Sequence, residues 1–255
     1  MIYDYVSLGT NFETGTDDDG IEWCVSSLVG WHDTPPLSQD VMAITSANRE
    51  LIVRSQLSAR PVVVRGTGKG ALGTDKSEVV LAFDNLAGLF WPLRGDKLLT
   101  VTEAGITREL GTKPAGSIRK MWAGELAFIF EVPLLAEDPL KYEDEQDMGY
   151  NGSIAVINAG NFETWPVIMM DTDGIPEFTN TTVGSSGNVV GFTDTLPAGT
   201  IIDFKHRTII GPGAVDHYPK LDVARDDWWP LTVGVNNLTR GGTGDATIAW
   251  RNAWL

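Results

Sequence analysis

The stretch with the clearest potential for chemistry is PVVVRGTGKGALGTDKSEVVLAFDNLAGLF, residues 61–90. An apolar run leads into a glycine motif and a helix-like segment follows; the motif glycines are Gly68, Gly70 and Gly73. A dinucleotide site requires the helix to begin inside such a motif, so that the amides at its N-terminus face the pyrophosphate. Here the helix signals start at Asp75, after the third glycine, and an acidic side chain there would repel a phosphate.

Two further requirements of nucleotide sites are not met. A dinucleotide-binding fold needs repeated βαβ units, whereas one helix is visible, and Glu103, the acidic residue that ends the next strand, comes too late in the sequence. The phosphate-loop pattern fails because Val63 and Gly70 stand where Gly and Ser or Thr are required. We therefore predict that the glycines form a mobile loop between a strand and a helix and bind no nucleotide.

Two acidic clusters resemble fragments of calcium-binding loops. One consists of Asp17, Asp18 and Asp19 with Gly20, and the other of Asp171 and Asp173 with Gly174. A helix–loop–helix calcium site needs a glutamate at its twelfth position, which is Thr182 when counted from Asp171. Turn formation is the better interpretation of both clusters. We predict no metal site.

The remaining candidates for catalysis do not form a set. The histidines lack metal-ligand spacing; they are His32, His206 and His217. Asp203 lies near His206 in the sequence, but no serine in a nucleophile motif accompanies them. Acidic pairs are too many to single out two glycosidase carboxylates, and the tryptophans suit core and interface positions better than a sugar-binding platform. We predict no catalytic, cofactor-binding or metal-binding residue and no enzymatic activity.

Composition narrows the class of protein further. The 255 residues, 42% of them hydrophobic, suffice for one large or two modest domains. A net charge of −15 argues against binding to nucleic acids or anionic membranes, and the chain has no apolar run long enough to span a bilayer. The N-terminal residues do not resemble a signal peptide, and the lone Cys24 excludes disulfides within the chain. We expect a soluble protein made in a reducing cytoplasm.

Short segments rich in β-branched and aromatic residues, bounded by turn formers, dominate both halves of the chain. One helix is predicted, with Asp75 as its N-cap, Glu78 as the capping-box partner and Pro92 at its end. The apolar face of this helix consists of Val79, Val80, Phe83, Leu86, Ala87 and Phe90. The second half has no helix signal and predicts a β-sandwich.

An acidic segment, residues 136–150, separates the two halves. It contains no apolar period, and its acidic residues outnumber Lys141; they are Glu137, Asp138, Glu143, Asp144, Glu145 and Asp147. Such a segment predicts a solvated linker. We expect an N-terminal domain over residues 1–138, an acidic linker over 139–150 and a C-terminal domain over 151–255.

Several short motifs follow one another along almost the whole chain. The first half carries DGIEWCVSSLVGW, RPVVVRG, the helix and FEVPLLAEDPLKY, which ends in an Asp-Pro-x-x-Tyr exit (Asp138, Pro139, Tyr142). The second half carries a Gly-x-x-x-Thr-x-Pro opening (Gly160, Thr164, Pro166), an Ile-Asp…Arg hairpin (Ile202, Asp203, Arg207), a Trp-x-x-Leu…Gly-x-Asn turn (Trp229, Leu231, Gly234, Asn236) and a closing strand, ATIAWRNAW. In this order the motifs resemble the distal tail protein family of long-tailed bacteriophages, also described as siphovirus tail components or minor tail proteins. Val233 departs from the pattern, because relatives often have proline before the glycine of that turn.

The resemblance implies an N-terminal β-barrel-like domain with one α-helix and a C-terminal galectin-like β-sandwich. It also implies a structural virion protein of the phage tail tip, synthesised in the host cytoplasm. Its hexameric ring, which we expect the N-terminal domain (residues 1–138) to form, would join the tail tube protein to hub or fibre proteins and surround a channel for the tape measure protein and DNA. Acidic charge that lines or flanks that channel would keep DNA from adhering as it passes. No cofactor, specific nucleic-acid binding or membrane span is implied.

Two other classes stay open. A secreted or cell-surface carbohydrate-binding β-sandwich module would explain the sandwich and the tryptophans, but not the absence of a signal-peptide pattern. The chain also lacks room for the carbohydrate-binding insertions that some relatives of the family carry, which argues against direct host recognition. An enzyme, either a glycosidase or a nucleotide-dependent protein, lacks an organised set of acids and bases.

Overall fold

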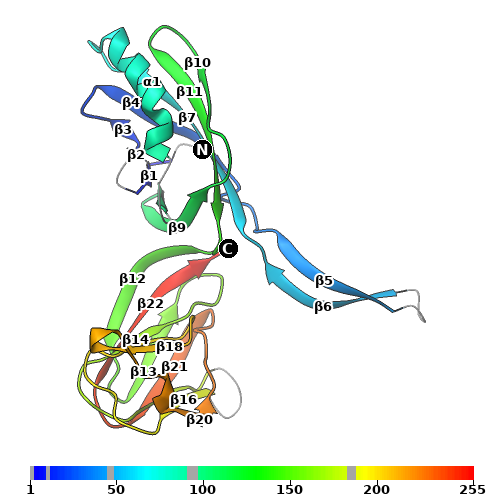
Figure 1. Cartoon of the computed structure of the whole chain (residues 1–255), viewed down its shortest axis with the longest axis vertical. Helices are drawn as coiled ribbons and strands as arrows, with labels where there is room; N and C mark the ends of the chain where they lie inside the picture. Colours follow the sequence, from blue (N-terminus) through cyan, green and yellow to red (C-terminus); the bar gives the residue numbers. More distant parts are fainter. Residues whose placement is uncertain (1–2, 10–11, 45–48, 91–96, 183–187) are drawn as a thin grey trace. The chain divides into compact units, whose positions relative to one another are not determined.

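The computed structural model (Figure 1) describes residues 3–9, 12–44, 49–90, 97–182 and 188–255. Contacts divide the chain into two units, one formed by Met1–Lys141 with Leu255 and the other by Tyr142–Trp254. Both units consist mainly of β-strands, and the described residues contain one α-helix, which confirms the predicted fold class. None of the helical segments in these ranges is long and apolar enough to cross a membrane.

Unit 1 has a barrel-like sheet. Its strands follow the order β2-β1-β8-β9-β11-β7-β4-β3, with β10 paired to β11. The two ends of this order, β2 and β3, are separated in sequence by Thr14 alone, so the chain itself brings the ends of the sheet together. The strands are β1 (Tyr5–Leu8), β2 (Phe12–Glu13), β3 (Gly15–Thr16), β4 (Ile21–Val29), β7 (Arg60–Gly70), β8 (Lys97–Glu103), β9 (Ile106–Pro114), β10 (Arg119–Trp122) and β11 (Ala127–Ala136).

The core of unit 1 depends on glycines in β7 that face aromatic rings from β11. A Cβ atom at Gly68 would lie 2.3 Å from the Phe128 ring, and one at Gly66 would lie 2.5 Å from the Phe130 ring. Only glycine leaves room for these rings beneath the strand. The prediction of a mobile loop is therefore wrong for Gly68 and Gly70, which lie in β7; Gly73 alone occupies the turn before the helix, with φ +96°.

The predicted helix is confirmed as α1, Lys76–Phe90. The Asp75 amide donates a hydrogen bond to Glu78 Oε2 (2.9 Å), which is one half of the predicted capping box. The buried residues are Val79, Leu86 and Phe90, whereas Val80 is 38% exposed and Ala87 is also exposed. The buried stripe is narrower than predicted because a single helix rests on the barrel along one line of contact. Pro92 lies outside the described residues.

A separate two-stranded sheet is formed by β5 (Leu37–Ile44) and β6 (Arg49–Leu57), visible in Figure 1 as a long hairpin. No other described strand pairs with it. At its base the side chains of residues 37–40 and 54–56 are all exposed, so neither face is covered there. An isolated two-stranded hairpin is only marginally stable in water.

Unit 2 is a β-sandwich. One sheet has the order β19-β18-β17-β14-β22-β12 and the other β13-β21-β15-β16-β20. Side chains from both sheets share one core, which includes Phe178, Ile202, Trp229 and Ile248. The strands are β12 (Lys141–Gly149), β13 (Ser153–Asn158), β14 (Val167–Met170), β15 (Pro176–Asn180), β16 (Asn188–Phe192), β17 (Ile201–Asp203), β18 (Thr208–Gly211), β19 (Val215–Asp216), β20 (Leu221–Asp226), β21 (Gly234–Gly242) and β22 (Ala246–Trp254); two 3₁₀ turns cover Pro212–Ala214 and Tyr218–Lys220.

The acidic segment has a regular form that the sequence did not predict. Most of it is strand β12, at the end of the first sheet of unit 2, instead of an irregular linker. From Asp144 to Gly149 every side chain is exposed, so the strand is held by its backbone pairing and leaves no apolar period in the sequence. That the units fold independently, with the limits 1–138 and 151–255, stays a prediction.

The glycine–aromatic packing of β7 leads to the first test. We expect Gly68→Ala to lower the free energy of unfolding by about 1–3 kcal/mol, because the new methyl group would displace the Phe128 ring. The matched control is Gly111→Ala in β9, where a Cβ would meet nothing within 4 Å. Urea unfolding should show a loss for the first variant and little change for the second; equal midpoints would contradict the packing role.

Candidate functional site

The first acidic cluster builds a turn. Asp17 Oδ1 accepts a hydrogen bond from the Ile21 amide (2.8 Å), and Oδ2 accepts one from Trp23 Nε1 (2.7 Å). The carboxylate thus shapes the tight connection between β3 and β4.

The second acidic cluster also serves turns. Asp171 accepts a hydrogen bond from the Thr247 hydroxyl (3.0 Å), and Asp173 accepts one from the Ala198 amide (2.7 Å). Within the residues that the structure describes, no group of three or more His, Cys, Asp or Glu side chains could hold a metal ion.

The structure brings Asp203 and His206 together in the tight turn between β17 and β18. Asp203 Oδ2 lies 2.7 Å from His206 Nδ1, and Oδ1 accepts the His206 amide at 3.0 Å. Partial burial would raise the pKa of Asp203, but the hydrogen bonds from His206 outweigh it, so the pKa lies below its usual value. The following Arg207 has φ +53°, which is turn geometry. The pair therefore closes a hairpin.

The other two histidines lie elsewhere. His32 Nε2 is 3.0 Å from Glu103 Oε1 in unit 1. His217 packs against β18, where a Cβ at Gly211 would lie 2.4 Å from its Nε2 atom. The three histidines do not share a site.

Motif residues of the C-terminal unit meet in a polar framework between its strands. Thr164 and Leu231 exchange backbone hydrogen bonds of 3.0 and 2.7 Å. A Cβ at Gly160 would lie 2.0 Å from the Ala253 carbonyl oxygen, which explains why glycine is needed there. Asn158 Nδ2 donates to the Phe162 carbonyl (2.8 Å), and its Oδ1 accepts the Gly160 amide (3.1 Å). These residues fix loop geometry and leave no reactive group exposed.

The Gly-x-Asn turn is held by one side chain. Asn236 Oδ1 accepts the Thr232 amide (2.9 Å), and its Nδ2 donates to the carbonyls of Thr232 (2.8 Å) and Gly234 (3.1 Å). Gly234 has φ +91°. Val233 is exposed at this turn, so the turn closes through Asn236 without a proline at that position.

A buried cationic cluster explains the Asp-Pro-x-x-Tyr exit of unit 1, and sequence reasoning missed it. Arg60 is 1% exposed and donates to four carbonyl oxygens: those of Gly30 (3.0 Å), Trp31 (3.2 Å), Asp33 (2.6 Å) and Pro139 (2.7 Å). Lys141 is 5% exposed, and its Nζ donates to the Trp31 carbonyl (3.0 Å). Arginine directly before the apolar run PVVV was the available signal, because a charged residue at a buried strand position needs several partners.

Burial of Lys141, together with the neighbouring positive charge of Arg60, lowers the pKa of its ammonium group to about 8. The unfolded chain keeps this proton up to the usual lysine pKa of about 10.4. Between these two values the unfolded state binds more protons, so stability contributed at this site rises with pH. The protonated form predominates only well below pH 8, and there burial of the charge costs stability.

The titration of Lys141 gives the second test. We expect wild type to gain roughly 3 kcal/mol relative to Lys141→Met when the pH rises from 7 to 10.5, because the wild-type protein sheds a buried proton that the variant lacks. Lys69→Met removes an exposed lysine of the same unit and serves as control. Unfolding by urea at several pH values measures both differences. If the difference in free energy of unfolding between wild type and Lys141→Met does not change with pH, the lowered pKa of Lys141 is contradicted.

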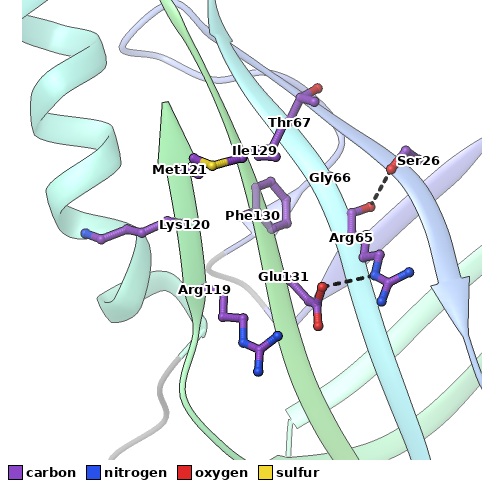
Figure 2. Close-up of a pocket in the computed structure, with 10 residues that line it drawn as sticks. All are labelled: Ser26, Arg65, Gly66, Thr67, Arg119, Lys120, Met121, Ile129, Phe130 and Glu131. Carbon is purple, nitrogen blue, oxygen red and sulfur yellow. Dashed lines mark hydrogen bonds and ion pairs between the residues drawn. The ribbon is translucent and has the colours of Figure 1, made fainter. Parts of the chain in front are cut away.

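A groove of about 400 Å³ lies on the outer face of unit 1, over strands β4, β7, β11 and β10 (Figure 2). Its lining combines apolar and charged side chains; the residues are Ser26, Arg65, Gly66, Thr67, Arg119, Lys120, Met121, Ile129, Phe130 and Glu131. Arg65 Nε pairs with Glu131 Oε2 at 3.1 Å. Lys120 points away from the groove and donates to the Phe83 carbonyl in α1 (2.6 Å).

This groove could not be found from the sequence, because it depends on strand register. In that register Met121 lies opposite Ile129, and Ile129 opposite Thr67. Two positions along, Arg119 lies opposite Glu131, and Glu131 opposite Arg65. The outer face therefore carries an apolar row beside a charged row.

Comparison with known proteins agrees with this fold. The siphovirus-type tail component C-terminal domain family matches residues 159–254. The crystal structure of the Dit protein of phage SPP1, described as a hub of the adsorption apparatus in phages infecting Gram-positive bacteria, is 20% identical with a TM-score of 0.71, over 91% of this chain and 94% of that one. A chain of the activated phage P2 baseplate with calcium is 9% identical with a TM-score of 0.51, over 99% and 98%.

The P2 baseplate with strontium gives a similar result, with 9% identity, a TM-score of 0.51 and coverage of 97% of both chains. No curated protein matches the chain. The resemblance to the distal tail protein family is therefore confirmed: residues 159–254 match the C-terminal domain of siphovirus-type tail components, and the chain has the fold of Dit.

Proposed function

We propose that this protein is a structural protein of the phage tail tip, a distal tail protein whose copies form a hexameric ring. The ring joins the tail tube protein to the hub or fibre proteins and surrounds a channel for the tape measure protein and DNA. Support comes from the family match in the C-terminal unit and from the fold shared with Dit and with baseplate chains. The protein acts in the virion by holding partners together, and the described residues offer no organised set of catalytic groups.

The observation that carries the ring is a sheet with two open edges. In unit 1, β10 pairs only with β11 among the described strands. On the opposite side, β3 covers β4 only at Glu22 and Trp23, and no other described strand pairs with this edge, although the Leu28 amide donates to the Tyr3 hydroxyl (3.1 Å); the edge from Cys24 to Ser27 is therefore open among the described strands. Open edges are templates for pairing with another chain. If β10 of one copy lies beside β4 of the next, the same head-to-tail contact repeats until the ring closes.

The hairpin of β5 and β6 supports the same conclusion. Its base is exposed on both faces and it pairs with no other described strand. Because such a hairpin is marginal alone, a neighbouring subunit or tail protein is the natural source of its missing contacts. A protein that works only in an assembly can carry an element of this kind.

A second function, carbohydrate binding, is favoured by one hollow in unit 2. It has a volume of about 170 Å³, and Tyr142, Trp165, Lys205 and Arg251 contribute to its lining. Aromatic rings beside cations suit sugar hydroxyls and ring faces. The volume falls below the range of about 300–1,000 Å³ typical of ligand pockets, so we rank this function second. If the full chain binds no sugar on glycan arrays, carbohydrate binding is excluded.

The proposed ring can be tested by cross-linking, because Cys24 is the only cysteine and lies at the open edge of β4. In the full chain we expect Met121→Cys or Arg119→Cys to form oxidised ladders that end at the closed ring, since β10 would lie next to Cys24 of the neighbouring copy. Within one copy, Cys24 and residue 121 are three strands apart, about 14 Å. That distance exceeds disulfide reach, so each bond must join two copies.

The matched control is Ile129→Cys, on the same face but one strand further from the edge, about 10 Å from a neighbouring Cys24. Wild type, with one cysteine, can give dimers at most. Non-reducing electrophoresis separates the species, and negative-stain images of the cross-linked sample count the copies. If negative-stain images of the protein without cross-links show rings, but both β10 variants give only dimers on oxidation, the ring closes through another surface.

A further inference from the structure

The outer face of unit 1 carries a groove that none of the described segments of the chain fills. Its apolar row is well exposed, with Met121 at 62% and Ile129 at 38%. The solvent face of an antiparallel sheet is usually polar. An exposed apolar row between charged side chains is a feature of surfaces that bind another molecule.

The charged row is unbalanced. Arg65 and Arg119 flank Glu131, as Figure 2 shows, and Arg65 pairs with it. Arg119 has no hydrogen bond or ion pair with any residue that the structure describes, although Glu131 lies opposite it in the sheet. The groove thus holds one spare positive charge in a chain whose net charge is −15. A ligand with a carboxylate would complement Arg119.

The spacing of the rows defines the ligand further. The apolar and charged rows are two residues apart along the strands, which is about 6.8 Å. One turn of an α-helix places residues i and i+4 about 6.0 Å apart along its axis. A helix lying along the strands can therefore set an apolar side chain on Met121 and Ile129 and an acidic side chain on Arg119.

The position of the groove favours a helix over an extended chain. The groove lies on the face of the sheet, where no backbone donor or acceptor is free for a ladder; those lie at the edges. An extended segment would lose hydrogen bonds to water without replacing them, whereas a helix satisfies its backbone internally. Helix-in-groove binding relies on side chains at this spacing.

We propose that this groove binds an amphipathic helix of a partner protein, through an apolar side chain and a carboxylate one turn apart. The inference rests on the proposed ring: closure through β10 and β4 would turn this face toward the channel, because the core and α1 cover the opposite face. The helix would then belong to a tail protein that occupies the channel. On this face Arg65, Lys69 and Arg119 lie beside Glu22 and Glu131, so the face itself would add no net negative charge to the channel.

A nucleic acid fits the same face less well. Backbone phosphates require several cations in succession, whereas here Glu131 and Glu22 interrupt the cations, each within 4 Å of a basic side chain. An exposed Met121–Ile129 row offers nothing to a phosphate backbone. The two partner classes can be separated by experiment.

The probe is a fluorescein-labelled, alanine-rich peptide of about 20 residues, long enough to be helical in water, with Leu and Glu four positions apart on one face. Fluorescence anisotropy with the full chain should show saturable binding. Arg119→Gln and Met121→Ser should each weaken it about tenfold, the effect expected from losing one charged hydrogen bond or one buried apolar contact. Lys69→Gln, on the same face but outside the groove, should change it less than about twofold.

Any one of three results would overturn the proposal. The first is no binding at about 1 mM peptide, a concentration at which a binding free energy of about 4 kcal/mol is still detected. The second is equal binding of a peptide with Lys in place of Glu, and the third is tighter binding of an oligothymidylate, which would assign the face to nucleic acid. Circular dichroism of each variant confirms that it is folded.

The peptide needs only the groove of one copy, so light scattering reports on the ring separately. Rings without peptide binding would refute the groove alone, and binding without rings would refute the assembly alone.

Discussion

The antiparallel pairing of β7 with β11 is the constraint on which unit 1 depends. It runs the full 10 residues of β11, from Ala127↔Lys69 to Ala136↔Arg60. On its inner side Gly66 and Gly68 give space to two phenylalanine rings, which in turn contact Trp23 and Phe90. At one end the same pairing buries Arg60, whose hydrogen bonds tie the chain's exit from unit 1 to the loop that follows β4. Its outer side carries the groove.

Residues whose types suggest chemistry in the sequence have structural roles in the fold. Glycines that resemble a phosphate motif admit aromatic rings, and an acid that resembles a calcium ligand closes a turn. In unit 2 Asn158 and Asn236 hold loops by pairing both ends of their amides with backbone groups. Such polar residues hold a loop in one geometry, because a change in loop conformation would leave these polar groups without their hydrogen bonds.

The features that were predicted correctly from the sequence are those with local causes. The helix followed from its capping residues and its apolar period, and the strand-rich halves from β-branched residues between turn formers. Features that depend on distant pairing were missed. The strand β12 lacks an apolar period, so only its pairing partner makes it visible. The burial of Arg60 and Lys141 requires carbonyl oxygens from residues 30–33 and 139, and the groove requires the register of three strand pairs.

The shortness of β10 has a consequence for how copies would add to one another. Four residues offer few backbone hydrogen bonds, and Arg119 and Lys120 discourage random pairing at that edge. In a ring closed through this edge, each junction is weak alone, and partial arcs fall apart readily. The last junction differs, because its two edges are already held close together and form a contact without a further loss of free translation. Incomplete or misaligned arcs would therefore be transient, while the closed ring would persist.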